Sequence, residues 1–340
     1  MNGSGRRILV TGGFGFIGSH LVEQLLQEGS FVHVVDDLSS SPIDVDQYTA
    51  QVRHRENLTW DICTVKQYFQ RKSLPDFDEA FHLANVVGPV GVLEHAGDIV
   101  RKTVEDTYAI ADFVASRGGR LCDVSTSEVY GGGRDGYCSE KDSMIMSPKT
   151  SVRLEYAVAK LACEIALMNQ TKSRGLHVVI IRPFNVAGPR QSSRGGFVLP
   201  RFISQALNGE DLTVYGDGRM VRAFTHVVDV ADGIIRALRR GQAGEVYNIG
   251  NPANRTNILH LAEEVVRLSG SSSKVVFVDP KKLWGPLFEE ANDKYPDADR
   301  AINDLGWKPR HDLQATINDT IQYLRDGRDA SMAASARSGL

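Results

Sequence analysis

Over the first half of the chain, the apolar residues follow two patterns in turn, one typical of buried strands and one typical of helices. Short, nearly continuous apolar runs, which predict buried strands, lie at 6–12, 31–37, 79–85, 120–126 and 177–183. Longer segments between them space their apolar residues three and four apart, which predicts helices over 19–29, 98–118 and 153–175. Strands that alternate with helices predict an α/β fold, a Rossmann-type doubly wound parallel sheet covered by helices on both faces.

After Pro183 the pattern changes to loops, short helices and isolated strands, which predicts a smaller C-terminal substrate lobe. One later run, EVYNIGN (245–251), reads as a strand that rejoins the main sheet, so the two lobes are expected to be interleaved. The small polar residues at the end of the chain predict a disordered tail. The expected division is 1–183 with 223–251 for the sheet domain, 184–222 and 252–326 for the substrate lobe, and 327–340 for the tail.

Composition narrows the possible functions. The chain has 340 residues, 42% of them hydrophobic, a net charge of −3 and a pI near 6.3, which argues against a partner that is nucleic acid or a membrane surface. No apolar stretch approaches the roughly 18 residues of a membrane span. The N-terminus leads into a strand without a signal-peptide pattern, and four cysteines lie far apart with no CxxC. We therefore expect a cytoplasmic protein with reduced thiols and no metal site.

A glycine turn lies between the first strand and the first helix. TGGFGFIG (11–18) places Gly12 at the tight turn, Gly15 where backbone approaches a pyrophosphate, and Gly18 where helix and strand pack closely. Phe16 and Ile17 open the helix, whose free N–H groups favour an anion. The turn therefore predicts a dinucleotide-binding site made by these five residues.

Two acidic residues extend this site. Asp36 ends the second strand, about 20 residues after the turn, where a carboxylate accepts from ribose hydroxyls and repels a 2′-phosphate. This favours NAD+ over NADP as the cofactor. Asp61, at the expected end of the third strand, is placed near the adenine.

A tyrosine and a lysine four residues apart carry the expected chemistry. Tyr156 and Lys160, in LEYAVAK, share one face of a helix. A tyrosine pKa near 10 is too high for a base at neutral pH, and lowering it by about three units takes about 4 kcal/mol. The Lys160 ammonium and the positive nicotinamide ring are expected to supply this stabilisation, so that Tyr156 accepts a proton from a sugar hydroxyl.

At this point the chain resembles the extended short-chain dehydrogenase/reductase family, the NAD-dependent nucleotide-sugar epimerases, dehydratases and decarboxylases. The resemblance covers nearly all of residues 6–325. It rests on TGGFGFIG, VVDDLSS, FHLAN, STSEVYG, YAVAK, RPFNVAGPRQ, LTVYGDG, HVVDV and DLGWKP. FHLAN departs from the family pattern, since Asn85 replaces a small residue near the nicotinamide side.

The segment STSEVYG (125–131) indicates which reaction of the family the chain resembles most. In the family, Thr126 hydrogen-bonds the sugar O4 beside Tyr156, and the residues after it differ between reactions. Ser127 stands where 4,6-dehydratases carry an aspartate, which argues against dehydration. Thr126, Ser127 and Glu128, with Arg153 three residues before the tyrosine, resemble UDP-glucuronate decarboxylases.

The resemblance implies oxidation at C4 of UDP-glucuronate, loss of CO2 from the resulting β-keto acid, and reduction to UDP-xylose with NAD+ regenerated. Lys294, in DKYPD, stands where these decarboxylases carry an arginine close to the sugar carboxylate, and Arg190 or Arg194 is the other candidate for that contact. A 4-epimerase of UDP-glucuronate or UDP-glucose stays open as the second interpretation. A non-catalytic NAD-binding sensor is the third.

The resemblance also implies how the rest of the substrate is held. Asn185, in RPFN, and Arg222, after VYGDG, match positions that grip the diphosphate. Uridine is the expected base. Family members commonly form homodimers through the helices expected here at 98–118 and 153–175, and Leu161, Ile165 and Leu167 fit either that interface or burial against the sheet.

Overall fold

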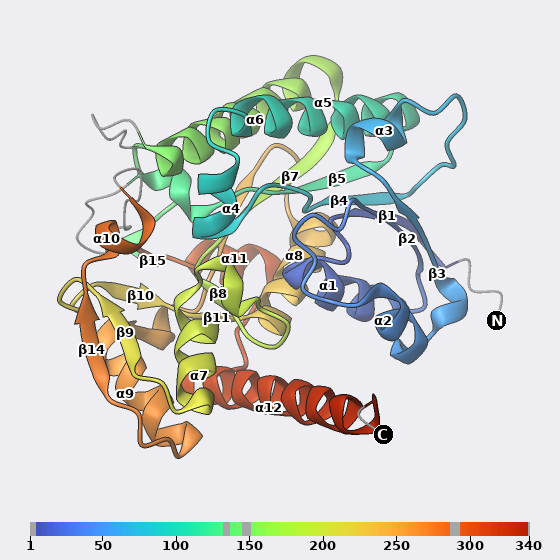
Figure 1. The fold of residues 1–340 in the computed structure, drawn as a ribbon. Coiled ribbons are helices and arrows are strands. Elements are labelled where there is room, and N and C mark those ends of the chain that lie inside the picture. Colours follow the sequence, from blue (N-terminus) through green and yellow to red (C-terminus); the bar gives the residue numbers. More distant parts are fainter. Residues whose placement is uncertain (1–4, 132–136, 145–150, 286–292, 339–340) are drawn as a thin grey trace.

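The computed structural model describes residues 5–131, 137–144, 151–285 and 293–338, with backbone alone for Arg194, Trp284 and 328–338. Helices cover both faces of a central sheet, and a smaller lobe lies beside one end of it (Figure 1). The predicted α/β Rossmann fold is confirmed.

The central sheet has seven strands, all parallel, in the order β12-β7-β5-β4-β1-β2-β3. Chain order reverses between β1 and β4, and the crevice at such a reversal is where doubly wound sheets bind ligands. The strands are β1 (Arg7–Thr11), β2 (Phe31–Asp36), β3 (Leu58–Ile62), β4 (Glu79–His82), β5 (Arg120–Val124), β7 (His177–Pro183) and β12 (Val246–Ile249).

The two faces of the sheet are buried in two separate cores. One face packs against α1 (Phe16–Gln27), α2 (Val45–Gln51), α8 (Val227–Arg240) and α11 (Asp299–Leu305). The other packs against α3 (Val65–Phe69), α5 (Ile99–Arg117) and α6 (Val152–Arg174). Apolar side chains therefore fill both faces of each central strand, which explains why the strands read as continuous apolar runs rather than alternating ones.

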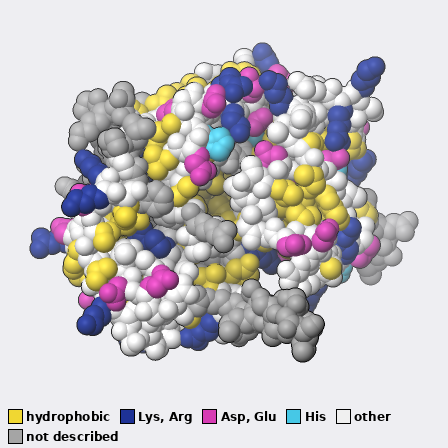
Figure 2. Space-filling model, in the orientation of Figure 1, with side chains coloured by type: hydrophobic (Ala, Val, Ile, Leu, Met, Phe, Trp, Pro, Cys, Tyr) yellow, Lys and Arg dark blue, Asp and Glu magenta, His cyan; other side chains and the backbone are white. Residues whose placement is uncertain are grey.

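The smaller lobe has its own core between short sheets and helices. It holds α7 (Val198–Asn208), β9 (Leu212–Tyr215), β10 (Val221–Ala223), β13 (Arg255–Asn257), α9 (Ile258–Ser269), β14 (Val275–Val278) and α10 (Pro280–Trp284). Short pairs tie it to the main domain: β8 (Val186–Ala187) with β11 (Thr225–His226), and β6 (Tyr137–Cys138) with β15 (Tyr295–Pro296). Helix α4 (Gly88–Glu94) follows β4 in the chain. Figure 2 shows that the face in view is hollowed near its centre, between α4 and α1.

The last helix differs from the expectation for the C-terminus. We predicted a disordered tail over 327–340, whereas α12 (Leu313–Ser338) continues through most of it. Alanine has the highest helix propensity, and the run ASMAASAR (330–337) contains four alanines. The four cysteines are free, and no helix among the described residues is long and apolar enough to cross a membrane.

Candidate active site

The glycine turn has the shape that a pyrophosphate requires. Gly12 has a φ of 72°, and a Cβ on Gly18 would lie 2.0 Å from the Gly12 carbonyl oxygen. Gly15 is the N-cap of α1 and brings no side chain to cap it, and the first turn, which Phe16 and Ile17 begin, carries no acidic residue. The N–H groups at this helix end are thus left for an anion, and the turn fits the diphosphate of NAD.

Asp36 is fixed at the end of β2 beside this turn. Its Oδ2 accepts from the Phe14 N–H at 2.9 Å, and its Oδ1 accepts from the Leu38 N–H at 2.8 Å. Burial raises the pKa of Asp36, while these two backbone donors lower it. Each carboxylate oxygen keeps a lone pair, so the residue can still accept from a ribose hydroxyl.

Asp61, on β3, is already engaged within the protein. Arg71 donates to both of its oxygens, at 2.7 and 2.9 Å, and these bonds hold its pKa below the usual range. Its contact with adenine stays a prediction. Any such contact has to share a carboxylate that Arg71 occupies.

The expected catalytic side chains converge where β5 meets α6. Thr126 is the N-cap of η2 (Ser127–Tyr130), in which Ser127 is buried, and its hydroxyl is hydrogen-bonded to Tyr156. Lys160 lies one turn further along α6, and its Nζ donates to the Val124 carbonyl at 2.8 Å. Its side chain is buried, so its charge acts on Tyr156 with little screening by solvent.

The pKa of Tyr156 differs from the expected direction. Burial raises it, while the Lys160 charge and the Thr126 hydrogen bond lower it, and the net direction is upward. The protein groups alone therefore do not acidify this phenol. Burial also acts on Lys160 and lowers its pKa, but Asp123 and Tyr156 outweigh it, so the pKa is raised and the lysine is a cation at neutral pH.

Glu128 lies between two cations from different parts of the chain. Arg153 donates from Nη1 to its Oε2 at 2.7 Å, and Lys294 donates from Nζ to its Oε1 at 2.7 Å. Burial raises the pKa of Glu128, but Arg153 and then Lys294 outweigh it and hold the pKa far below the usual range. Burial lowers the pKa of Lys294, which Glu128 only partly offsets. Glu128 is therefore ionised, and the structure brings Lys294 to the group that follows Thr126.

Two further predicted substrate residues lie near this cluster. Arg222, on β10, forms a parallel bridge with Lys294 and donates from Nη1 to the Val221 carbonyl at 2.8 Å. Asn185 follows β7 with a φ of 36°, and its Nδ2 donates to the Ala223 carbonyl at 3.4 Å. Arg222 is on β10 and Asn185 is bonded to the last residue of that strand, Ala223, so both lie where the two lobes meet.

Arg190 is held against α1, and its contact with the substrate stays a prediction. Arg190 donates to Glu23 Oε1 at 2.6 Å and to Ser19 Oγ at 3.3 Å, and its guanidinium lies over the Tyr48 ring. Of Arg194 only the backbone, in η3 (Ser193–Gly195), is described, and its side chain lies outside the described residues.

Sequence reasoning missed a set of buried charges beneath the catalytic pair. Arg182 donates to both oxygens of Glu164, one turn after Lys160, and the Ser125 hydroxyl donates to the same carboxylate. Asp123, on β5, is fully buried near Lys160. An aspartate inside the apolar strand RLCDV was the available signal, since such strands rarely carry an acid.

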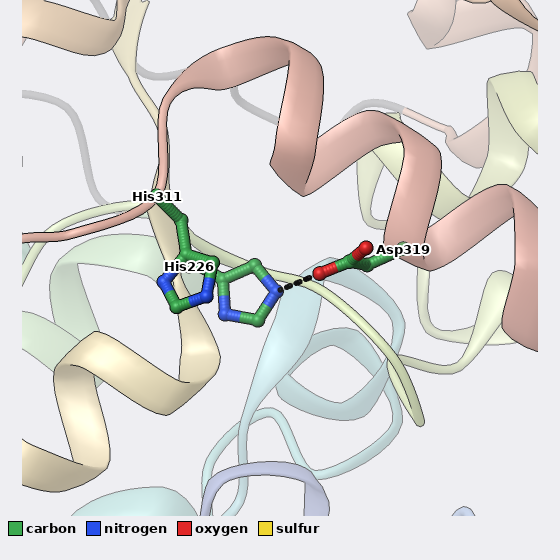
Figure 3. Close-up of side chains that lie close together, drawn as sticks. All are labelled: His226, His311 and Asp319. Atoms are coloured by element: carbon green, nitrogen blue, oxygen red, sulfur yellow. Dashed lines mark ion pairs between the residues drawn. The ribbon is translucent and has the colours of Figure 1, made fainter.

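One group of side chains in the described part of the chain has the composition of a metal site. His226, His311 and Asp319 lie close together (Figure 3). The two rings are stacked, with centroids 4.1 Å apart, and His226 Nδ1 accepts from the Val228 N–H. Nε2 therefore carries the proton and faces Asp319 at 3.3 Å, which leaves no ligand atom on His226. The group links α12 to β11 and does not fit a metal.

Comparisons with known proteins agree with this geometry. The model of the NAD dependent epimerase/dehydratase family matches residues 8–250. The chain is 33% identical to a UDP-N-acetyl-alpha-D-glucosaminuronate decarboxylase of Bacillus cytotoxicus, over 94% of this chain and 98% of the relative. It is 31% identical to UDP-glucuronic acid decarboxylase 1 of Xenopus tropicalis, over 94% and 72%.

Solved structures show the same architecture. The UDP-glucuronic acid 4-epimerase from Bacillus cereus, in complex with UDP-glucuronic acid and NAD, is similar with a TM-score of 0.78 and 27% identity, over 94% of this chain and 99% of that one. A UDP-N-acetylglucosamine 4-epimerase from Methanobrevibacter ruminantium has a TM-score of 0.83 and 27% identity, over 95% and 99%. The resemblance to extended short-chain dehydrogenases/reductases is confirmed, and the chain belongs to the NAD dependent epimerase/dehydratase family.

Proposed function

We propose that the chain is an NAD-dependent decarboxylase of a UDP-linked uronate, acting on UDP-glucuronate to give UDP-xylose. The observation that carries the proposal is Glu128 held between Arg153 and Lys294, next to the Thr126–Tyr156 pair. The names of the curated relatives, both decarboxylases of UDP-uronates, support the same reaction and uridine as the base.

The chain's own residues fit the first half of this reaction. NAD would be held by the glycine turn and Asp36, and it would supply the hydride acceptor for the sugar C4 and the hydride donor that restores it. Tyr156 takes the proton of the C4 hydroxyl, and the Thr126 hydroxyl, already bonded to Tyr156, holds the oxygen in line. Lys160 stays charged beside them and stabilises the phenolate.

The charge balance around Glu128 suits a substrate carboxylate. One carboxylate faces two cations, Arg153 and Lys294, and the Arg222 charge acts on Lys294 as well. The excess positive charge attracts the C6 carboxylate of a uronate and orients it. Once C4 is a ketone, this carboxylate leaves as CO2, because the electrons of the C5–C6 bond pass into the ketone. The enolate then takes a proton at C5 from solvent water, and the ionised Glu128 accepts a hydrogen bond from that water and orients it.

A 4-epimerase of UDP-glucuronate or UDP-glucose is the second candidate. Its support is the similarity to the 4-epimerase from Bacillus cereus. Both reactions begin with the same ketone, but an epimerase retains the carboxylate and returns hydride to the other face of C4. If Arg153 and Lys294 bind the substrate carboxylate, a neutral UDP-sugar such as UDP-glucose is expected to be a poor substrate.

Mass spectrometry of the product separates these reactions. Incubation with UDP-glucuronate is expected to give a product lighter by one CO2, and the Tyr156→Phe variant is expected to give none. A product of unchanged mass with a new NMR coupling at H4 would establish the epimerase instead. Parallel incubation with the 2-N-acetylated uronate tests which sugar is preferred. Binding of NAD without turnover of any UDP-sugar would support the third candidate, a sensor.

We also propose that the protein is a homodimer through α5 and α6. Val100 and Tyr108 on α5 and Ile165 on α6 are 41%, 41% and 48% exposed, although each is apolar or aromatic. Leu167 is instead buried against the sheet, and Leu161 is partly buried beside Phe184. Light scattering of an Ile165→Arg variant tests the proposal: a monomer is expected, against a dimer for the parent chain.

A further inference from the structure

A group of polar side chains lies behind the catalytic lysine, at the carboxyl ends of the central strands. Thr11, His82 and Asp123 are register neighbours on β1, β4 and β5, so their side chains leave the same face of the sheet. That face is covered by α5 and α6, and the strands beneath it are otherwise apolar. Three polar residues in one row at the strand ends interrupt a core that is apolar elsewhere.

Asp123 is the member of this row whose burial costs the most free energy of solvation. Its exposed fraction is 0%, and within the described part of the chain neither carboxylate oxygen has a hydrogen-bond partner. The Nε2 of His82 is likewise buried and without a partner there, while its Nδ1 lies 2.7 Å from the Thr11 hydroxyl. Buried carboxylates persist in proteins when a cation and ordered water compensate for lost solvation.

Lys160 is the cation that acts on Asp123, since its Nζ donates to the carbonyl of the next residue on β5, Val124, and its charge opposes the rise in the pKa of Asp123 that burial causes. The groups that act on its ammonium are Asp123 from β5, His82 from β4, and Tyr156, Cys163 and Glu164 from α6. Glu164 is bound by Arg182, so its charge is already balanced. Asp123 is the remaining carboxylate, and among the charges that favour the ammonium it has the largest effect.

Asn85, three residues after the end of β4, is a further partly buried polar residue beside α5. Asn85, the residue that departs from the small side chain of related sequences, accepts from the Thr103 hydroxyl of α5 at 3.2 Å. Its Nδ2 is buried, without a partner among the residues described. Buried polar atoms without a protein partner on His82 and Asp123, among the residues described, are the kind of group that ordered water satisfies in protein interiors.

We propose that Asp123 is a positioning residue of this enzyme: through direct charge and bridging water it holds the Lys160 ammonium charged and directed at Tyr156. The proposal rests on the function proposed above, in which Lys160 stabilises the Tyr156 phenolate. Lys160 has three N–H donors, and the Val124 carbonyl takes one of them. Burial raises the pKa of Asp123, which the Lys160 charge partly offsets, and Asp123 in turn raises the pKa of the buried Lys160 ammonium, so each group favours the charged form of the other.

The first test is the pH profile of kcat/KM for UDP-glucuronate in an Asp123→Asn variant. The amide keeps the shape and removes the charge, so Lys160 loses its proton at lower pH. The alkaline fall in kcat/KM is expected to begin about one pH unit lower than in the parent chain, mainly through kcat. The acid limb moves the same way by less, because the effect of Asp123 on the pKa of Tyr156 is smaller than those of burial, Lys160, Thr126 and Glu128. An unshifted alkaline limb would overturn the proposal.

A matched control separates this effect from loss of a buried acid in general. Glu79 is also buried on β4, at the opposite end of the strand, where Arg239 binds it. A Glu79→Gln variant is expected to melt at lower temperature but to keep the parent's alkaline limb. If its limb moves as far as that of Asp123→Asn, the shift is not specific to Lys160 and the proposal is wrong.

A second measurement needs neither turnover nor a stable Asp123→Asn protein. Lys160→Met leaves the Asp123 charge buried alone, and it is expected to lower the melting temperature. Adding Asp123→Leu removes that charge and is expected to restore most of the loss, since replacing both members of a buried pair costs little. A double variant no more stable than Lys160→Met would overturn the coupling. If no uronate is turned over but the double variant recovers, the proposed function fails while the coupling stands.

Discussion

The ion pair between Glu128 and Lys294 should couple the two lobes energetically. Its Nζ–Oε1 distance is 2.7 Å, and the two side chains are 3% exposed for Lys294 and 23% for Glu128. The test is a double-mutant cycle of Glu128→Gln, Lys294→Met and the two combined. Each new side chain is close in size to the one it replaces. Arg153 contacts Glu128 in both backgrounds that keep the glutamate, so the cycle isolates the Lys294 contact.

The expected magnitude follows from the geometry. At 2.7 Å and an effective dielectric constant of about 20, Coulomb's law gives about 6 kcal/mol of attraction. Burying the Lys294 ammonium offsets much of this, and a hydrogen bond to a charged group contributes about 1.5–3 kcal/mol net. We therefore expect a coupling free energy of unfolding of about 2 kcal/mol. Each single variant loses more than that pair term, because it leaves a buried charge without its partner.

Urea denaturation of the four proteins measures this coupling. The exposed pair of Asp112 and Arg174, at 3.2 Å with side chains 58% and 60% exposed, is the control. Its cycle of Asp112→Asn and Arg174→Gln is expected to give less than about 0.5 kcal/mol. A Glu128–Lys294 coupling as small as the control's would show that solvent screens the pair, and the argument for a charged carboxylate subsite would fail with it.

Three further outcomes are expected. Gly18→Ala places a Cβ 2.0 Å from a backbone oxygen of the glycine turn, so NAD affinity measured by calorimetry should fall at least tenfold. The control is Gly327→Ala, whose Cβ has no atom within 4 Å, and it should leave NAD affinity unchanged. Tyr156→Phe should lower kcat by about 10²–10⁴ while NAD binding is retained, and a smaller loss would remove the phenol from the reaction. Arg182→Lys cannot keep the two-point contact with buried Glu164, so unfolding free energy should fall by about 2–4 kcal/mol in thermal denaturation; an unchanged value would refute that pairing.

Local physical rules explain what could be predicted from the sequence. Strand and helix periods, the glycine turn and the Tyr156–Lys160 spacing each depend on backbone geometry within a few residues. The predicted helices at 98–118 and 153–175 correspond closely to α5 and α6. Even the tail at 327–340, predicted as disordered from its small polar residues, is helical to Ser338 by a local rule, the propensity of alanine.

Only the tertiary structure decided which charged groups meet. Lys294 and Glu128 are 166 residues apart, and a change in how the lobes pack would separate them without altering any local pattern. Arg190 pairs with Glu23 on α1, a contact between residues far apart in the chain that no local pattern indicates. Lys160 on α6 comes close to Asp123 on β5 because helix and strand pack together, with Nζ donating to the adjacent Val124 carbonyl. The sequence by itself determined the elements and the catalytic pair, whereas the environment that sets their charges came from contacts between segments that the chain separates.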